Sequence, residues 1–396
     1  MLQPPVMPRC FIGSLQAELI EKQQNQLYRQ RFALNGKQNV EIEIDHKKYI
    51  SFCSNDYLGL ASHPAIITAY KEGCELYGAG SGSAHLVTGY HQIHQRLEES
   101  LAEFTGFPRV LLFSTGYMAN LAIVTSLLEK NESIIEDRLN HASIIDAALL
   151  SKASLSRYQH LDMNSLIRQL ERCELDSRKL IATDSIFSMD GDLAPIEAII
   201  EQAQQYNAWV MVDDAHGFGV CGKTGRGSLQ QQQINTQDVT VYMATFGKAW
   251  GTFGAFVAGS HELIETLIQN ARSYIYTTAP PAALAYATLK SLEIVEQESW
   301  RREHLNLLVK TFRKGAAQLN LPITNSMTAI QPLMIGDSSK AINISQELKN
   351  KGFWVTAIRP PTVPKKTARL RITFSANHQL HHVEKLLEAL DKVIKI

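Results

Sequence analysis

Hydrophobic and polar residues change their spacing along the chain, and these changes predict where strands and helices lie. Short runs that are almost wholly apolar, such as 110–113 (VLLF) and 208–213 (AWVMVD), predict strands buried on both faces. Amphipathic stretches lie between these runs and predict helices. From about residue 65 to 258 the two kinds of segment alternate, which is typical of a mainly parallel sheet covered by helices on both faces.

The predicted elements of this region follow one another at short intervals. The strands are 110–113, 133–136, 155–159, 180–184, 208–213, 239–244 and 254–258, and the helices are 65–77, 91–105, 116–129, 141–151, 162–173 and 195–206. Before them, residues 12–34 predict an amphipathic helix and residues 40–52 a hairpin. After them come helices at 280–298 and 300–319, strands near 328–335, 353–358 and 369–374, and a closing helix at 379–394.

This change of rhythm predicts more than one domain. A chain of 396 residues is long enough for about two. We expect residues 1–53 to form an N-terminal helix and hairpin that pack with a small domain. Residues 54–290 are expected to form the large domain, and residues 291–396 the small α+β domain.

Composition and charge narrow the class of protein. The 39 basic and 39 acidic residues cancel, which argues against nucleic acid or an anionic membrane as the main partner. The five cysteines are scattered without a C-x-x-C pair, so we expect a reducing compartment and no metal site. Residues 1–5 show no secretory signal, and no apolar stretch reaches the ~18 residues of a membrane helix. These features predict a cytoplasmic protein.

A lysine near the end of one buried strand is the first candidate for chemistry. The apolar run 239–244 leads into 245–248 (TFGK), so Lys248 follows a strand end next to a glycine. Lysine forms Schiff bases, and desolvation lowers its pKa toward reactivity. A lone loop lysine is more often a solvated surface residue. The residues upstream favour a pyridoxal phosphate (PLP) site instead.

A carboxylate and a histidine follow the strand at 208–213. Asp213 ends that strand, where a buried carboxylate is costly unless it meets a cation. The protonated ring nitrogen of PLP is such a cation, and His216, three residues on, could contact the 3′-oxygen of the cofactor. The alternative for Asp213 is a turn or cap carboxylate.

Three further positions carry weaker signals. Residues 114–117 (STGY) follow a strand and open a helix, where backbone N–H groups and the helix dipole suit a phosphate, although the same residues are ordinary helix caps. His141, at another helix start, could stack on the pyridine ring or simply cap the helix. Arg369 and Arg371 point the same way from one strand and could clamp a carboxylate or form structural ion pairs.

Residues 217–224 (GFGVCGKT) satisfy both the dinucleotide fingerprint and the P-loop pattern. Both motifs need a helix to begin at once, with its N-terminus toward the phosphates. Here Gly225 and Gly227 follow the motif and disfavour a helix. Asp213 and Asp214 precede it and would place negative charge beside any phosphate. We reject a nucleotide site, although a nucleotide-binding regulatory module stays the rival from another functional class.

Several of these motifs, in this order, resemble those of the α-oxoamine synthases. The segments are 54–60 (SNDYLGL), 187–192 (FSMDGD), 213–217 (DDAHG) and 245–248 (TFGK). The resemblance runs from about residue 25 to the C-terminus. It implies a fold-type I PLP-dependent acyltransferase whose large domain binds PLP, and which condenses an amino acid with an acyl thioester and releases carbon dioxide.

The resemblance also implies roles for individual residues. Lys248 becomes the Schiff-base lysine, Asp213 the partner of the ring nitrogen and His141 the stacking residue. The other implied cofactor neighbours are His216, Ser188, Thr245 and the backbone of Gly116 and Tyr117. Arg371 and Arg29 would bind the amino acid carboxylate, and Asn55 and Thr362 would line the substrate cleft. In the family's homodimer, Thr277 and Thr278 would reach the phosphate of the neighbouring chain.

Segments 274–278 (YIYTT) and 360–364 (PPTVP) are most similar to the members of biotin synthesis, which use L-alanine and a pimeloyl thioester on CoA or acyl carrier protein. The sister enzymes glycine C-acetyltransferase and 5-aminolevulinate synthase share nearly all the motifs and stay alternatives. Residues 83–85 (SAH) depart from the usual Gly-Ser pair followed by Arg or Gly, near the expected active-site entrance. This departure bears on acyl-chain specificity.

Overall fold

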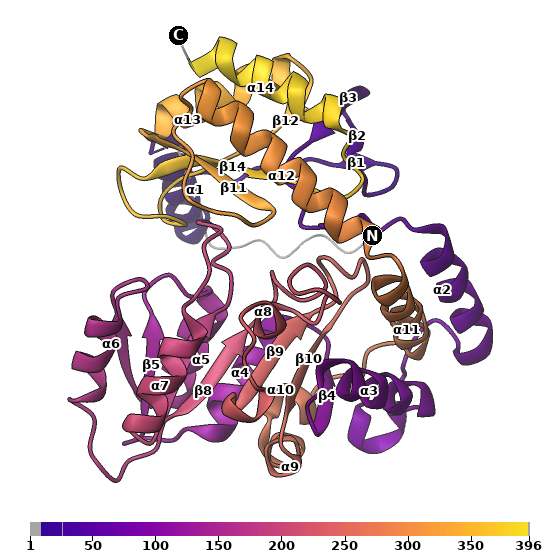
Figure 1. Ribbon diagram of the computed structural model, residues 1–396, viewed down its shortest axis with the longest axis vertical. Helices are drawn as coiled ribbons and strands as arrows, with labels where there is room; N and C mark the ends of the chain where they lie inside the picture. Colours follow the sequence, from indigo (N-terminus) through magenta and orange to yellow (C-terminus); the bar gives the residue numbers. More distant parts are fainter. Residues whose placement is uncertain (1–8, 26, 395–396) are drawn as a thin grey trace.

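A seven-stranded sheet organises the larger part of the molecule (Figure 1). The computed structural model describes residues 9–25 and 27–394, so the segment 1–5 considered for a signal lies outside the described residues. The strands lie in the order β4 (Arg109–Phe113), β10 (Ala255–Gly259), β9 (Val241–Thr245), β8 (Trp209–Asp213), β7 (Lys179–Asp184), β5 (Ser133–Asp137) and β6 (Ser154–Tyr158). Only β10 runs antiparallel to its neighbours, which confirms the predicted, mainly parallel sheet.

Each strand contributes alternate side chains to two separate hydrophobic cores. In β7, Ile181 packs in one core while Leu180 and Ala182 pack in the other. This alternation follows from the two-residue period of a strand, and it explains the nearly continuous apolar runs. Helices α4 (Gly116–Leu127), α5 (Ala142–Ser151) and α9 (His261–Asn270) pack into the second core, and α3 (Gln92–Thr105), α6 (Met163–Leu170), α7 (Ile196–Gln205) and α11 (Ala282–Gln297) into the first.

The C-terminal part forms a second layer, drawn above the large sheet in Figure 1. Its strands are β11 (Ile330–Gly336), β14 (Ala368–Thr373) and β13 (Thr356–Ile358), and its helices are α12 (Trp300–Gln318), α13 (Ser338–Asn350) and α14 (Leu380–Ile394). The N-terminal hairpin, β2 (Glu41–Ile44) and β3 (Lys47–Ser51), joins this part because β3 pairs in parallel with β12 (Phe353–Trp354). The predicted boundary at 290 falls inside α11, and the division into domains stays a prediction.

The helix predicted at 12–34 is wrong in its second half. Helix α1 spans Arg9–Gln24, and residues 27–33 are not helical. Tertiary contacts hold this segment instead. The guanidinium of Arg359 donates to the Tyr28 carbonyl at 3.1 Å, and the Phe32 ring meets the edge of Trp354.

The sequence reading also missed helices. Helix α13 begins after Asp337, whose side chain accepts a hydrogen bond from the Lys340 N–H at 2.8 Å. This N-cap is a signal that could have found it. Helix α9 begins in the same way after Ser260. Within residues 9–25 and 27–394, no helix is long and apolar enough to cross a membrane.

Candidate active site

A cavity of about 240 Å³ lies where strands β8 and β9 end and helices α4 and α5 begin. Ligands of open α/β sheets bind at this position, beyond the carboxyl ends of the strands. Seven of the predicted cofactor residues line the cavity, namely Gly116, Tyr117, His141, Asp213, His216, Thr245 and Lys248. The fold therefore brings together residues that are up to 132 positions apart in the sequence (248 minus 116).

Asp213 offers a carboxylate to this cavity. Its side chain is 6% exposed, Oδ2 accepts a hydrogen bond from Asn120 Nδ2 at 2.8 Å, and Oδ1 accepts one from the Ala215 N–H at 3.0 Å. Both partners are neutral, and within the described part of the chain no cationic side chain hydrogen-bonds to the carboxylate. A cation bound in the cavity would compensate its burial.

Lys248 supplies an amine to the same cavity and is half-buried. Burial lowers the pKa of its ammonium and the Arg371 guanidinium adds to this effect, while Asp213 and Asp184 oppose it. A lysine whose pKa is lowered is neutral more of the time and is then a nucleophile or a base.

The two predicted histidines are held by different neighbours. His141 is the N-cap of α5, and its Nδ1 lies 2.8 Å from the Ser143 hydroxyl. Nδ1 of His216 lies 2.7 Å from the hydroxyl of Tyr57, which is fully buried. Burial lowers the pKa of His216 well below its usual value, and the neighbouring Lys248 acts the same way. His216 is therefore neutral at physiological pH.

One end of the cavity suits a phosphate. Helix α4 starts there, its N-cap Thr115 accepting from the Met118 N–H at 3.1 Å, so the N–H groups of Gly116 and Tyr117 lie in its first turn. Thr245 Oγ1 is buried and has no hydrogen-bond partner among the described residues. A Cβ added to Gly116 would lie 2.7 Å from Thr245 Cγ2, so only glycine fits against this threonine. An orphaned hydroxyl beside an open helix N-terminus fits the phosphate group of PLP.

Arg371 lies next to the cavity on β14, and its side chain is 7% exposed. Both terminal nitrogens donate to Asn55 Oδ1 at 3.1 Å, and Nε donates to the Ser188 carbonyl at 2.6 Å. A guanidinium has five N–H groups, of which Ser188 and Asn55 take three, and the Tyr57 hydroxyl is a further partner of this guanidinium. Its neighbour Arg369 forms an ion pair with Asp190, which confirms the structural alternative for that arginine.

Other predicted residues lie outside the cavity. Arg29 and Thr362 are exposed and line a separate groove of about 820 Å³ between the 27–32 segment and α13. Thr278 forms an isolated bridge with Ala84, and neither it nor Thr277 lines the cavity of its own chain. Their predicted contact is with a second chain, and it stays a prediction.

Three polar residues at the site were missed. Asn120 is buried on α4, and its Nδ2 donates both to Asp213 and to Ser143 Oγ at 2.8 Å. Ser143 in turn contacts His141, so one chain of contacts links the carboxylate to the histidine. Asp184 is buried at the end of β7 beside Asp213, and burial raises its pKa well above the usual value. Asp184 ends the strand at 179–184 just as Asp213 ends the strand at 208–213, so the same sequence signal could have found it.

The glycine-rich segment 217–224 surrounds a buried side chain and does not open a helix. Residues 217–227 form turns and bends, and the short helix α8 begins only at Ser228. Asp214 is fully buried and accepts from Ser228 N–H (2.8 Å), Ser228 Oγ (2.6 Å), Tyr242 OH (2.6 Å) and Ser185 Oγ. Gly217 and Gly227 pack directly against this carboxylate. The glycines thus serve the loop around Asp214, and the helix start that a nucleotide site needs does not follow them directly.

Comparisons with known proteins agree with this geometry. A family model described as aminotransferase class I and II matches residues 47–390. A protein of Nitrosococcus oceani named 8-amino-7-oxononanoate synthase is 52% identical over 377 residues, which is 95% of this chain and 100% of that protein.

Two solved structures extend the comparison. Serine palmitoyltransferase from S. paucimobilis, in a variant with bound PLP–myriocin, matches with a TM-score of 0.91 and 28% identity over 98% of each chain. 8-Amino-7-oxononanoate synthase from Francisella tularensis matches with a TM-score of 0.77 and 32% identity, over 88% of this chain and 98% of that one. These likenesses confirm the predicted fold-type I architecture.

Proposed function

The chain belongs to the class I and II aminotransferase family and, within it, to the PLP-dependent α-oxoamine synthases, and we propose that it forms 8-amino-7-oxononanoate for biotin synthesis. In this reaction the α-carbon of L-alanine bonds to the carbonyl carbon of a pimeloyl thioester, the thiol leaves, and the alanine carboxyl departs as carbon dioxide. The observation that carries the proposal is the cavity that places Lys248, Asp213 and an open helix N-terminus together.

These residues would hold PLP at both ends. The N–H groups of Gly116 and Tyr117 and the free hydroxyl of Thr245 would bind its phosphate, and Asp213 would hold the proton on its ring nitrogen. When bound, PLP supplies an electron-poor ring that stabilises negative charge on the α-carbon of the amino acid. Asn120 would keep the Asp213 carboxylate in place through its 2.8 Å hydrogen bond.

The other side chains act on the substrate. Lys248 would carry the cofactor through Nζ, and its lowered pKa suits it to take the α-proton of alanine and later return one. Arg371 would bind the alanine carboxylate through its charge and through N–H donation beyond the bonds to Asn55 and Ser188. His141 would pack on the cofactor ring, and neutral His216, fixed by Tyr57, would donate or accept one hydrogen bond beside it.

We also propose a cytoplasmic homodimer in which Thr277 and Thr278 reach the partner's phosphate. Phe253, which lines the cavity, is 55% exposed, and Tyr276, next to Thr277, is 71% exposed; exposed apolar side chains of this size favour coverage by a second chain. Cys53, Cys74, Cys173 and Cys221 are free, as suits a reducing compartment. Arg29 and Thr362, in the separate groove, would contact the substrates, the pimeloyl group being carried on CoA or on acyl carrier protein.

A substrate panel tests this function. The purified protein with PLP is offered L-alanine or glycine together with pimeloyl, acetyl or succinyl thioesters, and kcat/KM is compared. The highest value is expected for alanine with the pimeloyl donor, with 8-amino-7-oxononanoate identified by mass. Preference for glycine with a short donor would instead make the chain a sister α-oxoamine synthase.

A further inference from the structure

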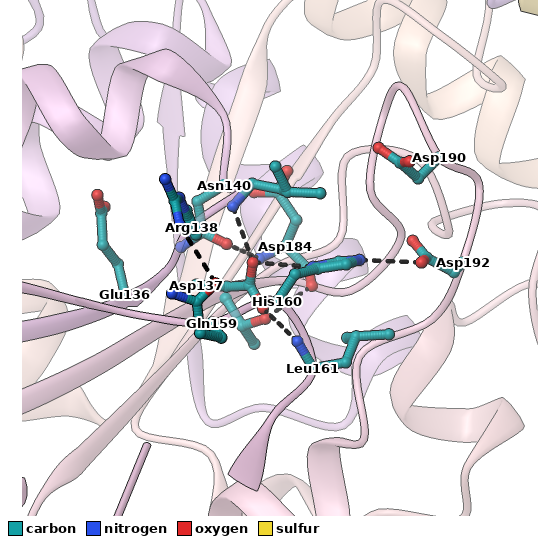
Figure 2. A network of polar contacts seen from close by, with 12 residues as sticks. Glu136, Asp137, Arg138, Asn140, Gln159, His160, Leu161, Asp184, Asp190 and Asp192 are labelled. Carbon is teal, nitrogen blue, oxygen red and sulfur yellow. Dashed lines mark hydrogen bonds and ion pairs between the residues drawn. The ribbon is translucent and has the colours of Figure 1, made fainter. Parts of the chain in front are cut away.

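A histidine outside the cavity lies between two carboxylates. His160 follows β6, with Nδ1 2.9 Å from Asp137 Oδ1 and Nε2 2.9 Å from Asp192 Oδ2 (Figure 2). Asp137 is fully buried at the end of β5, and its two oxygens also accept the N–H groups of Leu139 (2.8 Å) and Leu161 (3.0 Å). The histidine thus joins the edge of the large sheet to the loop that carries Asp192.

The geometry determines the charge of this histidine. Ionised carboxylates only accept hydrogen bonds, and a neutral imidazole has a single N–H. Both ring nitrogens can donate at once only if the ring carries two protons and a positive charge. Burial alone would lower its pKa, but the hydrogen bonds and charges of Asp137 and Asp192 raise the pKa of His160 to about 10.

The loop at 187–192 connects this charge to the substrate site. Its carbonyl oxygens accept hydrogen bonds from the C-terminal part of the chain. The Ser188 carbonyl accepts from Arg371 Nε (2.6 Å), and the Met189 carbonyl accepts from Arg369 (3.2 Å). The Gly191 carbonyl accepts from the hydroxyls of Ser326 (2.7 Å) and Thr328 (3.0 Å). The imidazolium holds the loop from the other side. The centroid of its ring lies 4.4 Å from that of the Phe187 ring, and the two rings are nearly perpendicular. The loop is therefore fixed between the large sheet and β14.

We propose that His160 is a charged positioning residue for the amino acid substrate. It holds the 187–192 loop through Asp192, and the Ser188 carbonyl of that loop sets the orientation of the Arg371 guanidinium. His160 itself touches neither substrate nor cofactor. The inference rests on the proposed function in one respect, that Arg371 binds the carboxylate of alanine.

The test replaces His160 by glutamine in the PLP-loaded protein. Glutamine carries no charge and cannot bridge both carboxylates as the imidazolium does. We expect KM for L-alanine to rise about tenfold, as for the loss of a charged hydrogen bond, while kcat changes less than about threefold, because carboxylate binding is shared by ground and transition states. The amount of bound PLP should stay the same. Asp192→Asn should also raise KM for L-alanine, and it serves as the second variant if His160→Gln does not fold.

Arg157→Gln is the matched control. Arg157 forms an ion pair with buried Glu136 on the same two strands (3.4 Å), so its loss affects the sheet edge without a bond to the loop. We expect it to leave KM for alanine unchanged. If His160→Gln moves KM no more than this control does, or lowers kcat alone, the positioning role is wrong.

A second readout does not depend on turnover. In protein labelled with ¹⁵N-histidine, both ring nitrogens of His160 should be protonated at pH 8, and one should lose its proton in Asp192→Asn. A neutral His160 in the unmodified protein would overturn the inference. If the substrate panel shows no condensation, the spectral change of bound PLP on titration with alanine still reports carboxylate binding, so the two proposals fail separately.

Discussion

Exchanging each carboxylate of the Asp213–Asp214 pair for an amide separates catalysis from folding. We predict that Asp213→Asn loses activity with little loss of stability, and that Asp214→Asn does the reverse. The two residues are adjacent and both buried, yet Asp213 lines the cavity while Asp214 holds the 217–228 loop. An equal change of charge at neighbouring positions therefore has different consequences.

The hydrogen bonds of Asp213 give the size of its effect. An amide nitrogen placed toward Asn120 can be accommodated if Asn120 turns its amide and presents Oδ1, and this turn gives up the bond from its Nδ2 to Ser143 Oγ. The free energy of unfolding should fall by only about 1 kcal/mol. The ring nitrogen of PLP, however, would lose its ionised partner, which costs at least ~1.5–3 kcal/mol and lowers kcat/KM by roughly tenfold or more.

Asp214 behaves differently because all of its partners are donors. An asparagine can direct its nitrogen to the hydroxyls of Ser185 and Ser228, which can turn, and keep its oxygen on the Ser228 N–H, which cannot. All four bonds to the carboxylate, at ~1.5–3 kcal/mol each, become bonds to a neutral amide at ~0.5–1.5 kcal/mol each, and removal of the buried charge offsets part of this loss. The free energy of unfolding should therefore fall by about 2–3 kcal/mol, with kcat/KM per folded protein little changed.

Two measurements on the same samples decide the matter. Urea unfolding gives the stability of each variant, and kcat/KM with alanine and a pimeloyl thioester is normalised to the folded, PLP-bound fraction. Asp238→Asn, an exposed carboxylate-to-amide change, is the control and should alter neither quantity. If folded Asp214→Asn loses more kcat/KM than Asp213→Asn, the assignment of the ring partner is off by one residue.

Three other perturbations have equally definite outcomes. Lys248→Ala should abolish turnover while the urea midpoint stays near that of the unmodified protein, and turnover at the original rate would end the proposed mechanism. Gly116→Ala should weaken PLP binding by about 1–3 kcal/mol because its Cβ would meet Thr245 Cγ2 at 2.7 Å, and adding Thr245→Ser should restore binding measured by PLP titration. The pKa of His160 is raised from 6.5 to about 10, so its protonation contributes fully to stability below pH 6.5, and this contribution is lost as the pH rises to about 10. The urea midpoints of the unmodified protein and of His160→Gln should therefore converge near pH 10.

The sequence by itself determined the local features of this protein. Apolar runs of four to six residues located six of the seven strands of the large sheet, since a strand buried on both faces must be apolar throughout, whereas edge strand β6 lies at the predicted segment 155–159 of mixed polarity. The same runs indicated where the polar residues that line the cavity lie, because Asp213 ends one strand and Lys248 lies three residues after the end of another. The family motifs added the cofactor, and the comparisons confirm it.

Only the tertiary structure decided which distant residues meet. Arg371 bonds to Asn55, which lies 316 positions away, and His160 joins Asp137 to Asp192 across three separate segments. The extended path of residues 27–33 and the antiparallel course of β10 were decided in the same way. Hydrophobic periodicity reports which face of an element is buried, but strand order and side-chain partners depend on contacts between elements, and these leave no regular spacing in the chain.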